Sequence, residues 1–294
     1  MKKVIIDCDN TFGLSGRDVD DGLTLLYLTG RPTIELVGVT LTHGNGTLTE
    51  VAAATTKFKK FFEKTFDFYL GSETGSSAAS DFLVAQAAAY PGELTVIATG
   101  ALTNLAQAAR QDPAFFTKLK QLILMGGTTQ PLVVNEVPVS ELNFASDPQA
   151  AASVLTSGAK LAIMNGSLTA QAFFSKAEQA TLIQKLHRRL SWSAEEFLTH
   201  TLTDWIAWNE KVFHFSGFCN WDLATAIYLE YPELFSNERY FLADTQLRLA
   251  TGQLTLVERS DLPLVMPQRL LDVATFNQLM IAGIVAGFRK DDPQ

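Results

Sequence analysis

Short apolar segments alternate with longer segments of helical periodicity, and this alternation constrains the fold more than any other feature. The short segments are apolar at nearly every position, which is typical of strands covered on both faces of a sheet. We expect strands at Lys3–Ile6, Glu35–Leu41, Phe66–Leu70, Leu94–Ala98, Gln121–Met125 and Lys160–Met164. We expect the intervening helices at Asp21–Leu28, Thr49–Glu63, Asp81–Ala89, Asn104–Arg110 and Pro148–Leu155. The pattern predicts an α/β fold with a mostly parallel, doubly wound, Rossmann-like sheet.

The second half of the chain has a different pattern. Alternating polar and apolar residues on either side of Thr251-Gly252 predict a β-hairpin, formed by residues Arg239–Ala250 and Gln253–Arg259. No internal repeat, low-complexity tract or linker interrupts the sequence, so we expect a single domain over residues 1–294. The additional C-terminal helices are expected at Lys176–Leu190, Ser193–Phe213, Asp222–Tyr231 and Val273–Ala286.

Composition excludes several classes of protein. Of the 294 residues, 47% are hydrophobic, and the formal net charge of -8 comes without a basic block, so neither nucleic acid nor an anionic membrane is expected as a partner. No apolar run approaches the ~20 residues of a membrane span, and no cleavable signal is recognised. Two cysteines, Cys8 and Cys219, are too few for a disulfide framework or a zinc site. We therefore expect a cytoplasmic protein with reduced thiols.

Five aspartates fall in the run "IIDCDNTFGLSGRDVDDG" near the N-terminus. Asp7 and Asp9 end the first expected strand, where parallel sheets bind ligands, and Asp20 and Asp21 open the next helix. Taken alone, Asp20 would be a helix cap and Asp21 a solvated residue of the first turn. Four acids at one sheet edge repel one another, which indicates a cation, a shared proton or both. Oxygen ligands suit calcium or magnesium, although the spacing does not fit an EF-hand.

Two families share parts of this run. "IIDCDNT" resembles the first motif of the haloacid-dehalogenase-like phosphatases, which implies a nucleophilic Asp7, an acid/base Asp9 and magnesium. That family also needs a later acidic pair after another strand. The later strands end in "ATG" and "MGG", and the later pair Asp291-Asp292 lies in the tail. The phosphatase is the weaker interpretation.

Several motifs, in consistent order over most of the chain, resemble the inosine–uridine-preferring nucleoside hydrolase family. Its first motif is Asp-x-Asp, a short turn and Asp-Asp. Here Asp7-Cys8-Asp9 and Asp20-Asp21 match, with additional residues Thr11–Arg17 in the turn. Further similar stretches are "GVTLTHGN", "ATGALTNLAQAAR", "LILMGG", "SELNFASDPQAA" and "NWDLATAIYLEYP". The resemblance implies the fold of that family, a nucleoside substrate and a homodimer or homotetramer.

The resemblance also implies roles for individual residues. It implies Ca²⁺ held by Asp9, Asp21, the backbone carbonyl of Thr99 and Asp222, with Asp7 supporting these ligands from behind. Asp9 would take a proton from a metal-bound water as general base. The residues implied to surround the ribose are Asp20, Asn45, Met125, Asn135, Glu141 and Asn143. Taken singly, Met125 is better explained as a core residue and Asn135 as a turn residue.

The sequence departs from the family pattern at three places. Trp221 stands where pyrimidine-tolerant branches carry a histidine that protonates the leaving base. Trp-Asp resembles the purine-preferring inosine–adenosine–guanosine branch, which implies that Trp221 stacks on a purine and aids catalysis; the alternative is that it packs the helix start. Asp18 in the additional loop has no matching role, and "GSETGSSAASDF" lacks the usual His-Gly stretch. His214 is considered as a proton donor and is better explained as a surface residue. The expected function is calcium-dependent ribonucleoside hydrolysis, with a catalytically weak nucleoside-binding protein as the alternative.

Overall fold

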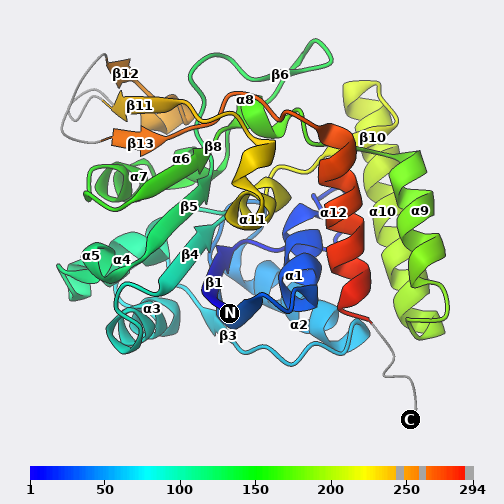
Figure 1. Cartoon of the computed structure of the whole chain (residues 1–294), viewed down its shortest axis with the longest axis horizontal. Coiled ribbons are helices and arrows are strands. Elements are labelled where there is room, and N and C mark those ends of the chain that lie inside the picture. The colour runs from blue at the N-terminus through cyan, green and yellow to red at the C-terminus, as the bar shows by residue number, and fades with distance from the viewer. Residues whose placement is uncertain (243–247, 258–262, 289–294) are drawn as a thin grey trace.

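A nine-stranded sheet forms the centre of the computed structural model, which describes residues 1–242, 248–257 and 263–288 (Figure 1). Its strand order is β12-β11-β13-β8-β5-β4-β1-β2-β3. In this order, the six strands from β8 to β3 are parallel to one another, and β13 pairs with β8 in parallel. Strand β11 is antiparallel to both of its neighbours, β12 and β13. The strands of this sheet are β1 (Lys2–Cys8), β2 (Ile34–Leu41), β3 (Phe68–Leu70), β4 (Leu94–Ala98), β5 (Gln121–Met125), β8 (Leu161–Met164), β11 (Arg239–Leu242), β12 (Leu256–Val257) and β13 (Pro263–Val265).

Helices cover both faces of this sheet (Figure 1). Side chains alternate along each strand, so Ile97 of β4 faces one hydrophobic core and its neighbours Val96 and Ala98 face the other. The first core includes residues of α1 (Asp20–Gly30), α2 (Leu48–Phe61), α9 (Lys176–Leu186), α10 (Trp192–Phe213), α11 (Leu223–Glu230) and α12 (Val273–Ala286). The second includes residues of α3 (Ala78–Ala89), α4 (Thr103–Gln111), α5 (Phe115–Lys118), α6 (Asn143–Ser146) and α7 (Pro148–Leu155).

Shorter elements complete the described chain. Two small antiparallel sheets lie outside the main one, and their four strands are β6 (Val133–Val134), β7 (Val137–Pro138), β9 (Phe173–Ser175) and β10 (Gly217–Cys219). The remaining helical turns are α8 (Gly166–Thr169), η1 (Pro232–Leu234) and η2 (Leu249–Thr251).

The structure confirms the predicted α/β class and mostly parallel sheet. Strands β4 and β5 and helices α7 and α12 have the predicted bounds. Helix α3 begins earlier than predicted because Ser77 and Ser80 form a capping box. Helix α9 ends at Leu186, before the predicted Leu190, where His187 leaves the helical conformation.

The predicted hairpin is correct in its pairing and in the place of its turn, but two residues before the turn were wrongly assigned to a strand. Strands β11 and β12 pair antiparallel, with Phe241 opposite Val257. Leu249 and Ala250 belong with Thr251 to a 3₁₀ turn that ends at Gly252 in the left-handed conformation. Residues 243–247 and 258–259 of the predicted strands, and the tail pair Asp291-Asp292, lie outside the described residues.

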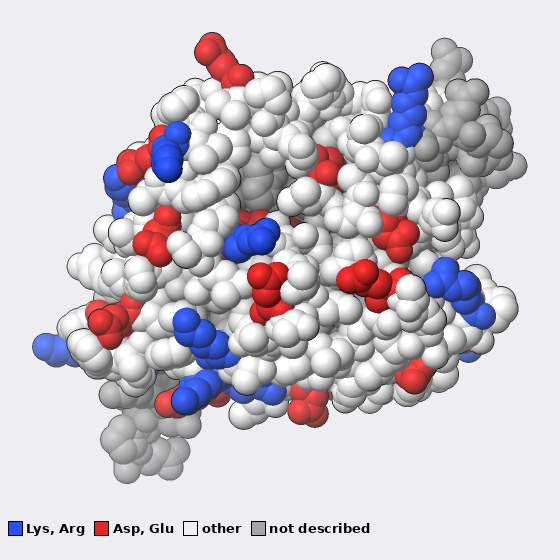
Figure 2. All heavy atoms as spheres, turned by 180° about the vertical axis from the view of Figure 1, so that it is seen from behind, with Lys and Arg blue, Asp and Glu red and all other residues white. Residues whose placement is uncertain are grey.

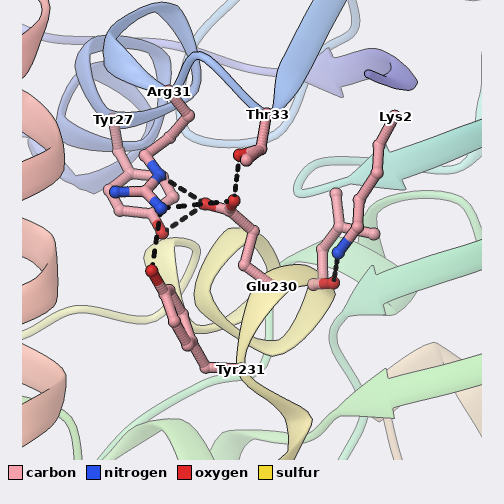
Figure 3. A network of polar contacts seen from close by, with 7 residues as sticks. Lys2, Tyr27, Arg31, Thr33, Glu230 and Tyr231 are labelled. Atoms are coloured by element: carbon pink, nitrogen blue, oxygen red, sulfur yellow. Dashed lines mark hydrogen bonds and ion pairs between the residues drawn. The ribbon is translucent and has the colours of Figure 1, made fainter.

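An ion-pair network fastens α1 to α11 at their C-terminal ends (Figure 3). The Glu230 carboxylate accepts hydrogen bonds from the Tyr27 hydroxyl at 2.7 Å and from Arg31 Nε at 2.6 Å, and also from the Thr33 hydroxyl. Arg31 donates a further bond to the Tyr231 hydroxyl. Because the opposite ends of these two helices carry Asp20, Asp21 and Asp222, the network fixes the helices that present the acids.

Surface charge is mixed on the face drawn in Figure 2. Basic and acidic side chains are interspersed there among the described residues. No helix in the described part of the chain is long and apolar enough to cross a membrane.

Candidate active site

Buried aspartates gather at the carboxyl edge of the sheet. Asp7 and Asp9 end β1, Asp20 and Asp21 begin α1, and Asp222 immediately precedes α11. All five are 0–3% exposed. The structure thus brings together acids that are more than two hundred positions apart in the sequence, as the resemblance implied.

Asp9 lies in a close-fitting backbone cradle. Its Oδ2 accepts a hydrogen bond from the backbone N–H of Asn45. A Cβ added at Gly44 would lie 2.3 Å from Oδ2, and one added at Gly100 would lie 3.1 Å from the same carboxyl group. Only glycine lets the backbone approach this closely on two sides. The cradle therefore fixes the direction of the Asp9 carboxylate.

The other acids are held by single contacts. The Asp20 Oδ2 accepts a hydrogen bond from the backbone N–H of Asp222 at 3.0 Å. The Asp21 Oδ1 accepts one from the hydroxyl of Thr99 at 2.7 Å. Thr99 directly follows β4 and is itself buried. These contacts connect the start of α1 to the start of α11 and to the end of β4.

Several oxygens of these acids have no hydrogen-bond partner in the described part of the chain. Asp9 Oδ1, Asp20 Oδ1 and Asp21 Oδ2 are buried and find no hydrogen-bond partner among the described residues. Burial raises the pKa of Asp9 to about 6, and burial together with the charges of Asp9 and Asp20 raises the pKa of Asp21 well above its ordinary value. Unsatisfied, mutually repelling carboxylate oxygens fit a hard cation. No group of three or more His, Cys, Asp or Glu side chains in the described ranges is arranged to hold an ion as it stands.

Asp7 lies behind this cluster. Its Oδ1 accepts hydrogen bonds from the Thr40 hydroxyl at 2.6 Å and from Asn104 Nδ2 at 2.8 Å. Burial raises its pKa to about 7, although these two bonds oppose the shift. A fully buried carboxyl group that fastens β1 to β2 and α4 suits a supporting role. It argues against Asp7 as the exposed nucleophile of a phosphatase.

A pocket of about 260 Å³ is lined by Asp222, whereas Asp9, Asp20 and Asp21 are not among the described residues that line it. Six of the predicted site residues line it, which are Asn45, Met125, Glu141, Asn143, Trp221 and Asp222. One wall is aromatic and comes from α10, through Trp205, Trp208 and Phe213. Trp205 and Trp208 stack on each other with ring centroids 4.7 Å apart. The acidic lining residues are Asp18, Glu141 and Asp222. Acidic and aromatic side chains in one pocket suit a ligand with a hydroxylated part and a flat part.

Glu141 and Asn143 both line the pocket, and Asn143 begins helix α6. Glu141 accepts hydrogen bonds from the backbone N–H groups of Gly127, Phe144 and Ala145, so its carboxylate caps the helix. Asn143 Nδ2 donates to the backbone carbonyl and the sulfur of Met125.

Asn135 does not join the site. It lies exposed in the turn between β6 and β7, with a positive φ of 46°, and its Nδ2 donates to the backbone carbonyl of Phe213 at 2.7 Å. It is not among the described residues that line the pocket. The ribose contact predicted for Asn135 is therefore corrected.

The sequence interpretation missed residues of the additional loop. Gly16, Arg17 and Asp18 all line the pocket. Asp18 keeps a buried Oδ1 without a partner among the residues described. Burial, followed by the charges of Asp20 and Asp9, raises its pKa well above the ordinary value. Its sequence position two residues before Asp20 was the available signal.

The histidines lie elsewhere. His43 Nε2 is 3.2 Å from the Thr103 hydroxyl, and His214 is exposed in the left-handed conformation after α10. Neither belongs to the described lining of the pocket. The structure therefore supports the interpretation of His214 as a surface residue.

Comparison with known proteins shows the family of the chain. The model of the inosine-uridine preferring nucleoside hydrolase family matches residues 4–278. A probable uridine nucleosidase 1 of Oryza sativa is 27% identical over 87% of this chain and 85% of its own length. The pyrimidine-specific ribonucleoside hydrolase RihB of Escherichia coli is 30% identical over 58% of this chain and 61% of its own.

Solved structures share the fold. The purine-preferring ribonucleoside hydrolase of Gardnerella vaginalis superposes with a TM-score of 0.80 at 22% identity, covering 97% of this chain and 99% of its own. A plant nucleoside hydrolase gives 0.79 at 21% identity, with the same coverage. The fold and the acid-lined edge define a hydrolase of the α/β class. The chain belongs to the inosine-uridine preferring nucleoside hydrolase family, whose members are N-glycosidases.

Proposed function

We propose that this enzyme hydrolyses the N-glycosidic bond of ribonucleosides with the aid of Ca²⁺. The observation that carries the proposal is the set of buried oxygens without a partner on Asp9, Asp20 and Asp21. Asp9 and Asp20 accept hydrogen bonds from the backbone N–H groups of Asn45 and Asp222, which line the pocket. Asp9, Asp21, Asp222 and the Thr99 carbonyl would hold the ion. Calcium bound there would supply positive charge that orients the sugar hydroxyls and makes a nearby water more acidic.

Asp9 acts as the general base in this proposal. The glycine-lined cradle and the Asn45 N–H hold one carboxylate oxygen, which leaves Oδ1 free to take a proton from the attacking water. The water oxygen attacks C1′, and the bond to the base breaks with its electron pair moving to the base. A fixed carboxylate adds to the rate because it needs no reorientation when the proton moves.

The sugar and the base occupy different walls in this proposal. Asp20, Asn45 and Asn143 offer oxygen and amide groups to the ribose hydroxyls. Trp221 offers a ring to the base, and the aromatic wall of α10 extends that surface. A purine has the larger face for stacking, and on that ground we propose that purine nucleosides are preferred. Two of the relatives are named a uridine nucleosidase and a pyrimidine-specific hydrolase, and these names favour a preference for pyrimidine nucleosides instead.

A nucleoside screen tests the proposal. Purine and pyrimidine ribonucleosides are incubated with the enzyme, with and without a calcium-selective chelator, and free ribose is measured. We expect release that the chelator abolishes, and inosine cleaved faster than uridine. Uridine cleaved far faster than inosine would end the purine preference alone.

An Asp9→Asn variant separates catalysis from binding. We expect it to lose roughly 100-fold or more in kcat, because the general base is gone. The matched control is Asp67→Asn, which changes an exposed aspartate far from the pocket in sequence. Unchanged ribose release by Asp9→Asn would refute the mechanism. Nucleoside binding without release by the wild type would show the weak binding protein instead.

A further inference from the structure

The additional loop, residues Asn10–Val19, is a packed part of the fold. Phe12 is fully buried, and its ring meets those of Phe58, Phe62 and Phe197 edge-on or nearly so, with centroids 5.6–5.8 Å apart. Phe12 therefore anchors the loop to α2 and α10 through an aromatic cluster.

Polar contacts fix the two ends of the same loop. Asn10 Nδ2 donates to the Thr55 hydroxyl at 3.2 Å, and the Thr11 hydroxyl donates to the carbonyl of Asp18 at 3.2 Å. The contact between Thr11 and Asp18 closes the loop on itself. A loop held in this way delivers residues 16–18 to a defined place.

Arg17 is exposed and lines the pocket. Its Nη1 donates to the backbone carbonyl of Asn45, the residue whose N–H holds Asp9. The preceding residue, Gly16, has a φ of 70° and lies against the ring of Trp208, where an added Cβ would be 3.5 Å away. Arg17 is thus linked through Asn45 to the general base, and it follows a residue that borders the aromatic wall.

Arg17 is also the one Lys, Arg or His among the described residues that line this pocket. Breaking an N-glycosidic bond leaves an electron pair on the departing base, which a hydrogen-bond donor or positive charge stabilises. The guanidinium carries a permanent charge and five N–H donors, and its side chain already reaches the pocket wall.

We propose that Arg17 donates a hydrogen bond to a ring nitrogen of the departing base; this rests on the proposed function. As C1′–N breaks, both bonding electrons go to the base, whose negative charge Arg17 stabilises. The proton of the attacking water goes to Asp9, which then releases it to solvent, and the base takes a proton from solvent, so that no net proton is gained or lost. The balance is one water consumed for each nucleoside, with no redox change.

Leaving-group dependence tests this role. Two substrates are compared: inosine, whose base needs help to leave, and p-nitrophenyl β-D-ribofuranoside, whose phenolate leaves unaided. For Arg17→Ala we expect kcat/KM to fall by roughly 100-fold with inosine and by less than about 3-fold with the nitrophenyl riboside. The same variant assayed with millimolar guanidinium should recover part of its inosine activity. Arg17→Lys keeps the positive charge but loses the planar set of N–H donors. Its kcat/KM with inosine should therefore lie between those of the wild type and Arg17→Ala.

Each result has one meaning. Arg110→Ala, which removes an exposed arginine of α4, is the control and should change neither rate. Equal losses on both substrates, or no loss on inosine, would overturn the role of Arg17. A wild-type enzyme that cleaves neither substrate would instead overturn the proposed function. Thermal unfolding of Arg17→Ala and Arg17→Lys shows whether either variant has a folding defect. If one has, recovery of inosine activity on adding guanidinium still supports the role of Arg17, and no recovery contradicts it.

Discussion

The backbone N–H of Asp222 donates a hydrogen bond to the Asp20 carboxylate at 3.0 Å, across 202 positions of sequence. The start of α11 is thereby joined directly to the start of α1. Because the donor is the backbone, the contact does not depend on the side chain of Asp222. The charge of Asp222 can therefore be removed without removing this link between the helices.

Asp222→Asn should reduce calcium binding while the fold is kept. A cation at 100 times its Kd stabilises a protein by about 2.7 kcal/mol. For a chain of this size that is a rise in Tm of roughly 5–10 °C on adding calcium to metal-free protein. We expect the rise in the wild type and in Asp67→Asn, and a much smaller one in Asp222→Asn. Differential scanning fluorimetry measures it, and equal rises in all three proteins would remove Asp222 from the calcium site.

The metal-free enzyme should lose stability as pH rises. Burial raises the pKa of Asp9 to about 6 and that of Asp7 to about 7. In the unfolded chain both carboxyl groups titrate near 4, so between about pH 4 and pH 7 the folded state binds more protons. The contribution of Asp7 and Asp9 to the stability of the fold is therefore fully present below about pH 4. It is lost as the pH rises through their pKa values in the folded protein.

The measurement is Tm in the presence of a chelator at several pH values. We expect metal-free protein to melt roughly 5 °C lower at pH 8 than at pH 5. Added calcium should reduce this difference, because the ion neutralises the ionised acids. A metal-free Tm that rises over the same interval would contradict the burial argument.

Trp221→Ala should affect purine substrates more than pyrimidine substrates. Stacking of a base on an aromatic side chain contributes ~1–3 kcal/mol, and the larger purine face loses more of it. We expect kcat/KM to fall by roughly 10-fold or more for inosine and by less for uridine. Trp221→Phe keeps an aromatic face and should retain most of the activity. Equal losses for both nucleosides would assign Trp221 to packing of the helix start.

Most of the fold could be predicted because the strands of a buried parallel sheet are apolar at nearly every position. Strand β4 and strand β5 have the predicted bounds for that reason. Strands β9, β10 and β13 were not predicted, since strands of two or three residues carry too little periodicity. Leu249 and Ala250 were misassigned to a strand because alternation alone cannot distinguish a strand from a 3₁₀ turn.

The acids of the site could be predicted because each follows a strand or opens a helix. Asp18 and Arg17 could not, since a loop has no periodicity that shows which side chains face a pocket. Their placement depends on the burial of Phe12 against residues of two distant helices. Asn135 was misplaced because a family position was carried into a segment that forms its own hairpin here.

Glu230→Gln should destabilise the fold through the network that joins α1 and α11. The Glu230 side chain is 5% exposed and that of Arg31 is 16% exposed, so loss of the charge leaves Arg31 poorly compensated (Figure 3). Breaking a fully buried pair costs about 3–5 kcal/mol, and partial solvent access reduces this to roughly 1–3 kcal/mol. Urea unfolding of the variant should show a lower midpoint with an unchanged slope. Glu210→Gln, which breaks the exposed pair with Lys176, should change the free energy of unfolding by less than about 1 kcal/mol. If the two variants were equally stable, the network would not hold the helices that present the acids.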